Sequence, residues 1–373
     1  MAVINIFFIL GGIIFFASNA SAEDYARAQT YFHSFNNNVK VLTAVFALNK
    51  DINLDTNTYF KYTVDIINPK LESEENEHGT AATTTTSGAS TAAGGSGAKD
   101  VRNEITAGVT HNFNNIVGVE LYYDYSKEND YTSHTPSLTL KKDLFEKNTT
   151  MTMSYSRNID KVYGKFMNGE QGRNTGNYFF GITQVLSPLT IAQLGYSRSN
   201  VTGYNSDGVR LASLNGVSQS SCTDRSASCV DEAFPDSRKR DAVVFGINQF
   251  IPNSIIDRSS VKFTYRYYND DWNIASNTEE VEYNEYITED TIFRVNFRYY
   301  EQTKANFVKD TYVSSDRYMS SSPQFNGFNS QLFGLKLTNN FLREGSFEGK
   351  YEYYSQSINT YAHIFMFTLR MTF

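Results

Sequence analysis

Hydrophobic side chains recur at every second position in many short segments of this chain. Segments 60–66, 117–125 and 261–267 each alternate aromatic or aliphatic residues with mainly polar ones. Because successive side chains of a β-strand point to opposite faces, this alternation predicts strands with one apolar and one polar face. No segment beyond residue 22 shows a sustained helical period, so the sequence predicts an all-β protein.

The alternation and the turn residues between the segments predict sixteen strands, with fourteen as the second choice. Their expected ranges are 25–35, 39–49, 56–67, 101–112, 116–126, 133–143, 148–158, 176–186, 189–199, 240–251, 259–269, 276–287, 290–302, 328–341, 346–356 and 360–373. Proline cannot donate to a strand ladder, and five of the six prolines fall between these strands. Pro136 falls inside segment 133–143, which leaves that boundary uncertain.

The connections between these strands alternate in length. Every even-numbered connection is short, whereas the long ones, 68–100, 158–175, 200–239 and 303–327, are all odd-numbered. Tight turns on one side and long loops on the other are typical of outer-membrane barrels. The sequence therefore predicts a transmembrane antiparallel up-and-down β-barrel with periplasmic turns, extracellular loops and both termini on the periplasmic side.

The two ends of the chain fit export to an outer membrane. The apolar run 3–17 is followed by Ala20-Ser21-Ala22, which predicts a signal peptide over residues 1–22. Residues 1–5 carry no Lys or Arg, so a buried or membrane-anchoring helix is the alternative, although the run is shorter than the ~20 residues of a spanning helix. The last strand resembles the signal read by the barrel assembly machinery and has an apolar face of Phe365, Phe367, Leu369, Met371 and Phe373. An ordinary edge strand is the alternative there.

Composition narrows the class further. The 28 Phe and 26 Tyr accompany a mean hydropathy of −0.43, which excludes a bundle of membrane-spanning helices. The net charge of −7 argues against nucleic-acid binding. The expected partners are instead outer-membrane lipids, the barrel assembly machinery and other envelope proteins.

Two of the long loops have distinctive sequences. Loop 68–100 begins with acidic residues and continues through Thr-rich and Gly-rich stretches, so we expect a low-complexity surface loop, with partner binding as the alternative. Loop 200–239 holds Cys222 and Cys229. An oxidising compartment favours a disulfide between them over a metal pair, because no His or further Cys lies nearby. Whether this loop fills the barrel is left open.

Charged residues occupy the polar face of the C-terminal strands. The expected lumen-facing charges are Lys262, Arg266, Glu280, Glu282, Arg294, Arg298, Lys336, Glu348, Lys350 and Glu352. Neighbouring strands thus present opposite charges. Two interpretations follow: a water-filled, charge-lined pore with local selectivity, or a lattice of wall ion pairs that holds the strands in register.

Aromatic residues gather toward one end of several strands. They are Tyr122, Tyr123, Tyr125, Tyr267, Tyr268, Trp272, Tyr299 and Tyr300. The pattern predicts a girdle at the membrane interface, with a sugar-binding track as the alternative.

The sequence offers little chemistry for catalysis. Among five histidines, only His134, with Ser133 and Ser137 nearby, is a conceivable part of a hydrolase site, and a solvated histidine at the rim is the simpler interpretation. No phosphate-binding glycine loop, haem attachment motif or metal-ligand spacing is found. We therefore expect no enzyme activity, no cofactor and no metal.

The second half of the chain resembles a family of bacterial outer-membrane β-barrel proteins classified only as a domain of unknown function. The segments that carry the resemblance are Phe180–Pro188 (FGITQVLSP), Tyr265–Trp272 (YRYYNDDW), Phe297–Gln302 (FRYYEQ) and Gly334–Leu337 (GLKL). It covers roughly residues 148–373, while the N-terminal half matches more weakly and the Thr/Gly-rich loop is a departure. The resemblance implies an outer-membrane barrel and, through relatives encoded beside exported redox proteins, a supporting role in an envelope redox system.

Three functions follow, in this order: a porin-like channel for small polar solutes, a non-conducting scaffold or accessory barrel for an envelope system, and an outer-membrane enzyme.

Overall fold

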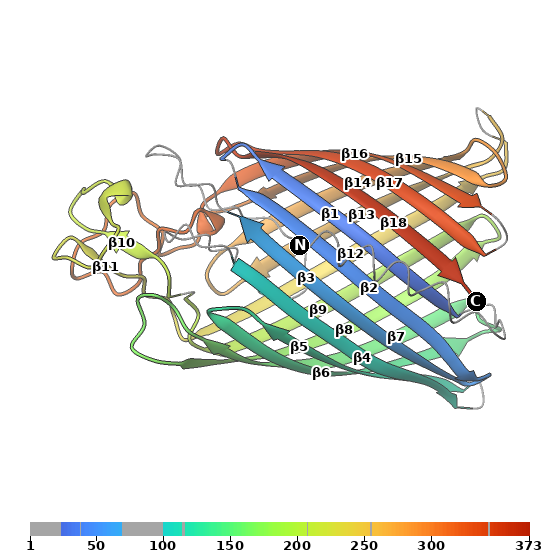
Figure 1. Ribbon diagram of the computed structural model, residues 1–373, viewed down its shortest axis with the longest axis horizontal. Helices are drawn as coiled ribbons and strands as arrows, with labels where there is room; N and C mark the ends of the chain where they lie inside the picture. Colours follow the sequence, from blue (N-terminus) through green and yellow to red (C-terminus); the bar gives the residue numbers. More distant parts are fainter. Residues whose placement is uncertain are drawn as a thin grey trace, which may run out of the picture.

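The computed structural model shows a closed antiparallel barrel (Figure 1). It describes residues 24–37, 39–68, 100–113, 116–206, 208–253, 256–341 and 344–373. The predicted signal peptide, residues 1–22, and nearly all of loop 68–100 lie outside these ranges. No helix within the described ranges has the length and apolar character needed to cross a membrane.

Sixteen strands form the barrel, so the prediction of sixteen is confirmed and the alternative of fourteen is wrong. They are β1 (Tyr25–Phe35), β2 (Lys40–Asn53), β3 (Thr56–Asn68), β4 (Asp100–Phe113), β5 (Val117–Lys127), β6 (Tyr131–Leu144), β7 (Thr149–Val162), β8 (Gln171–Ser187), β9 (Thr190–Gly203), β12 (Ser237–Ile251), β13 (Ser259–Asp270), β14 (Ala275–Tyr286), β15 (Thr291–Gln302), β16 (Phe328–Phe341), β17 (Gly345–Gln356) and β18 (Tyr361–Thr372). A two-stranded sheet, β10 (Leu211–Ser213) with β11 (Cys229–Asp231), lies in the connection between β9 and β12, and two short 3₁₀ turns, η2 (Gln219–Ser221) and η3 (Pro323–Phe325), lie in loops.

The barrel closes because β1 pairs with β18 as well as with β2. The β1–β18 ladder runs in register from Tyr25–Thr372 to Phe35–Ala362, and the amide of Phe373 donates to the carbonyl of Asp24. Both ends of the barrel chain therefore meet at the end with the tight turns, which we call the turn end. The opposite end, from which the long connections leave, is the loop end (Figure 1).

Two of the long loops are shorter than predicted because strands continue beyond the apolar alternation, whereas loop 303–327 has the predicted bounds. β7 reaches Val162 and β8 begins at Gln171, so the expected loop 158–175 shrinks to 163–170. Likewise β9 ends at Gly203 and β12 begins at Ser237, so the Cys-containing loop spans 204–236 instead of 200–239. Backbone pairing does not require apolar side chains, which only mark the part of a strand that faces apolar surroundings.

Pro136 lies inside β6, where its presence had left the boundary uncertain. It pairs with Tyr123 of β5, but neither Thr135 nor Pro136 has a ladder partner in β7, and that ladder resumes at Ser137. The strand therefore accepts the proline at an interruption of one of its two ladders.

The outer face of the barrel is a continuous apolar surface. Large hydrophobic side chains on alternate positions remain exposed, as for Phe245 at 41%, Phe297 at 44% and Phe367 at 55%. Phe297 lies opposite Phe333 across the ladder, so these side chains adjoin from strand to strand. A protein in water rarely exposes so much contiguous apolar surface, and a lipid environment accounts for it.

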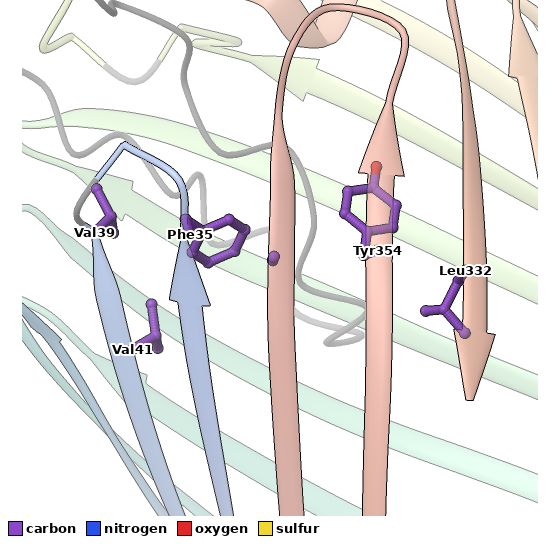
Figure 2. Packing of buried hydrophobic residues seen from close by; sticks show 6 residues of the cluster. Phe35, Val39, Val41, Leu332 and Tyr354 are labelled. Atoms are coloured by element: carbon purple, nitrogen blue, oxygen red, sulfur yellow. The ribbon is translucent and has the colours of Figure 1, made fainter. Parts of the chain in front are cut away.

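At the loop end, a small apolar cluster spans the closure seam. It contains Phe35, Val39, Val41, Leu332, Tyr354 and Ala362. Ala362 of β18 is the ladder partner of both Phe35 and Tyr354, so the two rings lie on either side of this small residue (Figure 2). The cluster therefore packs side chains of the first two strands against those of the last three.

The loops 204–236 and 303–327 fold together into a structure that we call the cap; residue 207 is not described. The amides and carbonyls of Ala233 and Met319 pair in both directions, at 3.1 and 2.9 Å. Glu232 accepts hydrogen bonds from Ser320 and Ser321. Figure 1 shows the β10–β11 part of the cap beyond the loop end of the barrel.

Two apolar clusters pack the cap, one of them against the connection between β13 and β14. One surrounds Trp272, which is 3% exposed, and contains Ile274, Ala305, Phe307, Val308 and Phe325, with Phe234 stacked on the Trp272 ring. The second contains Ala212, Leu214, Tyr312 and Met319. A disulfide joins Cys222 to Cys229 across a sequence separation of 7.

We expect the disulfide to stabilise the cap and not the barrel. Closing a loop of this size restricts the unfolded chain by about 2–3 kcal/mol, and only cap residues lie inside the closed loop. Replacing both Cys222 and Cys229 by Ser should accelerate proteolysis within 204–236 and leave the temperature at which the barrel loses its heat-modifiable gel migration unchanged. Ser220→Ala, in the same loop with the disulfide intact, is the control. A lower barrel transition temperature in the double variant would contradict this.

Candidate functional site

A cavity of about 980 Å³ lies at the loop end of the barrel, between its inner wall and the cap. Strands β8, β12, β13 and β15 contribute much of its wall. The cap contributes Asn205, Ser206, Glu232 and Phe234 from one loop and Ser322, Gln324 and Phe325 from the other. The volume lies at the upper end of the range found for small-molecule pockets.

The wall of this cavity is rich in arginine. Its lining includes Arg173, Arg198, Arg238, Arg240, Arg266 and Arg298, against the acidic residues Asp130, Glu232 and Asp241. Five of these arginines, on β8, β12, β13 and β15, reach one space because these strands lie close together in the barrel order and their side chains face inward, whereas Arg198 of β9 shares the facing of the exposed Tyr196.

Three of the six arginines are held by carboxylates. Arg173 donates to Asp160 at 2.9 Å, Arg198 lies 3.5 Å from Asp241, and Arg238 donates to Asp270 at 2.8 Å. The Arg238 guanidinium also lies over the Trp272 ring, 4.3 Å from its centroid. Asp270 in turn accepts from the backbone amides of Trp272 and Ile274. Arg238 therefore anchors the strand-to-cap junction.

The other three, Arg240, Arg266 and Arg298, make no ion pair with any described residue. The Nε of Arg240 is buried, with no hydrogen-bond acceptor in the described part of the chain. Arg266 lies 5.4 Å from the Tyr268 ring centroid. Glu280 is the ladder partner of Arg298 but does not line the cavity.

Most of the charges predicted to face the lumen lie nearer the turn end, as ion pairs along the wall. Glu282 lies between Lys262 at 3.6 Å and Arg294 at 3.0 Å, and Arg294 also donates to Asn284 at 2.7 Å. Lys336 lies 2.9 Å from Glu348, and Lys350 lies 2.6 Å from Glu352. Arg266 and Arg298 instead line the cavity. The ion pairs near the turn end correspond to the predicted wall lattice. The arginines of the cavity correspond to the predicted charge-lined pore.

Sequence reasoning missed Arg173, Arg238 and Arg240. Arg173 and Arg238 fall in ranges that the alternation assigned to loops, since the apolar pattern does not reach them, and Arg240 is only the first residue of the expected strand 240–251. The signal was present in the run Ser237-Arg238-Lys239-Arg240, where two arginines two residues apart precede an apolar strand. Spacing of two places both on one face once the strand is extended.

The aromatic residues predicted as a girdle divide between the two faces. Tyr123 and Tyr267 are exposed on the outside, at 47% and 43%, as a girdle requires. Tyr268, Tyr300 and Trp272 line the cavity instead, and Trp272 is buried beneath the cap, so the girdle prediction is wrong for these three. Adjacent residues of a strand cannot share a face, which is why a cluster of tyrosines divides in this way.

The residues weighed for hydrolase chemistry do not come together. His134 shares a hydrogen bond of 2.6 Å with the Tyr123 hydroxyl, whereas Ser133 donates to Asp160 at 2.7 Å. As neighbours on β6, His134 and Ser133 point to opposite faces. Ser137 donates only a long hydrogen bond of 3.5 Å, to the carbonyl of Tyr122.

The fold brings together one acidic group that the sequence did not suggest. Oxygen atoms of Asp100, Glu128 and Asp130 lie within 4.8 Å of one another beside the β5–β6 turn. The Glu128 carboxylate also lies 3.9 Å from the Arg102 guanidinium, with a side chain only 7% exposed. Burial raises the pKa of the Glu128 carboxyl to about 8; Arg102 lowers it, while Asp100 and Asp130 act in the same direction as burial.

Fold and site together define a closed sixteen-strand barrel of the outer-membrane type, with an apolar outer face and a charged interior. The chain belongs to the family described as "Protein of unknown function (DUF3570)", whose profile matches residues 16–168 and 162–364. The resemblance seen over 148–373 is thereby confirmed and extends through the N-terminal half. Comparison with curated proteins gives no match.

Among solved structures, the barrel is similar to a bacterial polysaccharide outer membrane secretin, with a TM-score of 0.53, 8% identity and coverage of 95% of this chain and 100% of that one. OccK8 (OprE) of Pseudomonas aeruginosa has a TM-score of 0.46 at 7% identity, covering 96% and 99%. A loop-deletion mutant of OmpT of Vibrio cholerae has a TM-score of 0.45 at 9% identity, covering 95% and 100%. At these identities the similarity concerns the fold alone.

The position of Glu282 between two cations predicts that it stabilises the wall more than either cation does. Glu282→Gln should lower the free energy of unfolding by about 1 kcal/mol, because Lys262 and Arg294 then face each other without a counter-charge. Lys262→Gln should cost less, since it leaves the Arg294–Glu282 pair intact. Urea unfolding of the detergent-refolded protein measures both. Equal effects of the two variants would show that the lattice adds nothing beyond single pairs.

The buried Glu128 predicts a pH-dependent stability. Its proton is bound more tightly in the folded than in the unfolded protein, so stability should decline as pH rises from about 4.5 to about 8. Glu128→Gln should remove this contribution and stabilise the protein at pH 8.5 by on the order of 1 kcal/mol. Urea midpoints at pH 5 and 8.5 provide the measurement, with Glu170→Gln in a neighbouring exposed loop as the control. If the urea midpoints of Glu128→Gln at pH 5 and pH 8.5 differ by as much as those of the intact protein, the assignment to Glu128 is wrong.

Proposed function

We propose that this protein is an outer-membrane channel that passes small polar solutes. The observation that carries the proposal is the combination of sixteen-strand closure with a charged interior and a sizeable cavity below the cap. A barrel of this strand number encloses more space than wall side chains fill. Ion pairs such as Lys262–Glu282, whose lysine side chain is 42% exposed on the inner wall, are consistent with water inside the barrel.

The location in the outer membrane belongs to the same proposal. The exposed apolar outer face supports it, because that face needs lipid. We propose export by the signal peptide at residues 1–22 and insertion by the barrel assembly machinery through the last strand, whose Phe365 and Phe367 point outward and are exposed. On this view the turn end is periplasmic and the cap extracellular.

The cap favours a second candidate, a scaffold or accessory barrel for another envelope protein. Its two loops share one apolar cluster with each other and another with the connection between β13 and β14, and they hydrogen-bond to each other, so they present a folded surface at the loop end. A cap that fills the mouth would suit docking better than transport. The channel remains the leading proposal because the cavity continues below the cap along the barrel wall.

Conductance in planar bilayers distinguishes the two. We expect stable, ohmic steps from the purified protein and larger steps from a variant in which residues 306–324 are replaced by a short Gly/Ser linker, since that removes half of the cap. Heat-modifiable migration of both proteins checks that the barrel is folded. Silence from both folded proteins would overturn the channel and favour the scaffold. Silence from the intact protein with steps from the variant would show that the cap closes the channel.

A further inference from the structure

The cavity carries more positive charge than its own carboxylates balance. Of its three acidic lining residues, Asp241 already contacts Arg198, and Glu232 accepts hydrogen bonds from Ser320 and Ser321 within the cap. Asp130 belongs to the acidic group beside Glu128. The guanidinium groups of Arg240, Arg266 and Arg298 are left without a carboxylate among the described residues.

These three arginines follow a diagonal across neighbouring strands. Arg240 of β12 stands in register with Asp270, near the cap. Arg266 of β13 lies four residues closer to the turn end, in register with Thr278 and, through it, Tyr300 of β15. Arg298 lies two residues further in the same direction. A solute moving along this wall would meet the three groups in succession.

The surroundings of the diagonal favour an oxyanion. A guanidinium presents its donors in a planar fork that matches carboxylate and phosphate groups, with hydrogen bonds roughly twice as strong as neutral ones. Hydroxyl groups of Ser197, Ser199, Ser276 and Thr278 line the same cavity and can act as further donors. Arg240 is partly desolvated, as its buried Nε shows, and an anion would supply the acceptor that this atom lacks.

We propose that Arg240, Arg266 and Arg298 form a binding site for small solutes that carry carboxylate or phosphate groups, and that the site makes the barrel anion-selective. The selectivity rests on the channel proposed above, whereas the binding does not. The cap covers the site and limits its exchange with bulk water, which strengthens the interaction between the cations and a bound anion. The wall lattice around Glu282 lies outside the cavity lining and takes no part.

The test compares a triple variant, Arg240→Gln, Arg266→Gln and Arg298→Gln, with Arg294→Gln as the control. Arg294 lies on β15 with the same facing as Arg298 but is paired with Glu282. Under a KCl gradient, the intact protein should show a reversal potential of an anion-preferring channel. The triple variant should lose that preference, and Arg294→Gln should keep it. A triple variant that conducts with an unchanged reversal potential would overturn the proposed selectivity.

Binding is measured separately, on the detergent-solubilised protein, with inorganic phosphate and succinate as probes and glycerol as the neutral control. Trp272 is the only tryptophan and lines the cavity, so its fluorescence reports on occupancy beside calorimetry. Losing charge-assisted hydrogen bonds should weaken binding in the triple variant roughly tenfold or more, while Arg294→Gln binds normally. Binding of phosphate alone would point to a phosphate-bearing solute, and binding of succinate alone to a carboxylate.

The two measurements separate the two proposals. If anion binding depends on the three arginines but the protein does not conduct, the binding site is supported and the channel is overturned. Conductance without binding or anion preference overturns the site and leaves the channel standing. Retained heat-modifiable migration shows that the triple variant is folded; if it does not fold, Arg298→Gln alone, compared with Arg294→Gln on the same strand, gives the same comparison with a smaller expected shift.

Discussion

The structure depends on closure of the hydrogen-bonded ladder between β1 and β18. In a lipid environment, backbone amides and carbonyls have no water to bind, so a sheet is tolerated only if it has no free edge. The register between the first and last strands meets this requirement from Tyr25–Thr372 to Phe35–Ala362. The apolar cluster beside Ala362 adds side-chain packing at the same seam, where the chain brings its most distant segments together.

Closure also separates two chemical environments with one set of strands. Alternation sends Phe297 outward and Arg298 inward, and Tyr267 outward and Tyr268 inward. On the inside, charges near the turn end are paired along the wall, and their attraction adds modestly to strand pairing. In the described lining of the cavity near the cap, six arginines accompany three carboxylates. The interior is thus structural in one zone and open to a ligand in the other.

The cap covers the loop end of the barrel and is tied to its wall. Arg238 links the barrel wall to the Trp272 cluster through Asp270, and the two long loops hold each other through Ala233, Met319 and Glu232. The cavity therefore has a wall built from strands and a cover built from loops. A rigid wall with an adaptable cover is a common arrangement for sites that receive solutes, because strands fix the position of binding groups and loops control access.

The sequence by itself determined the all-β class, the sixteen strands and the gathering of the long loops at one end, because alternation and turn residues are local signals. Membership of a barrel family followed from the resemblance of particular segments and not from the alternation. It placed Arg266 and Lys262 on one face but could not tell that Lys262 has a carboxylate partner, whereas Arg266 has none in the described part of the chain. It assigned Arg173 and Arg238 to loops because strand pairing continues where the apolar pattern has ended, and it placed Arg240 only at the start of a strand. Only the tertiary structure decided which strands adjoin, how the two loops fold over the barrel and which charges remain unpaired, since these depend on contacts between residues far apart in the chain.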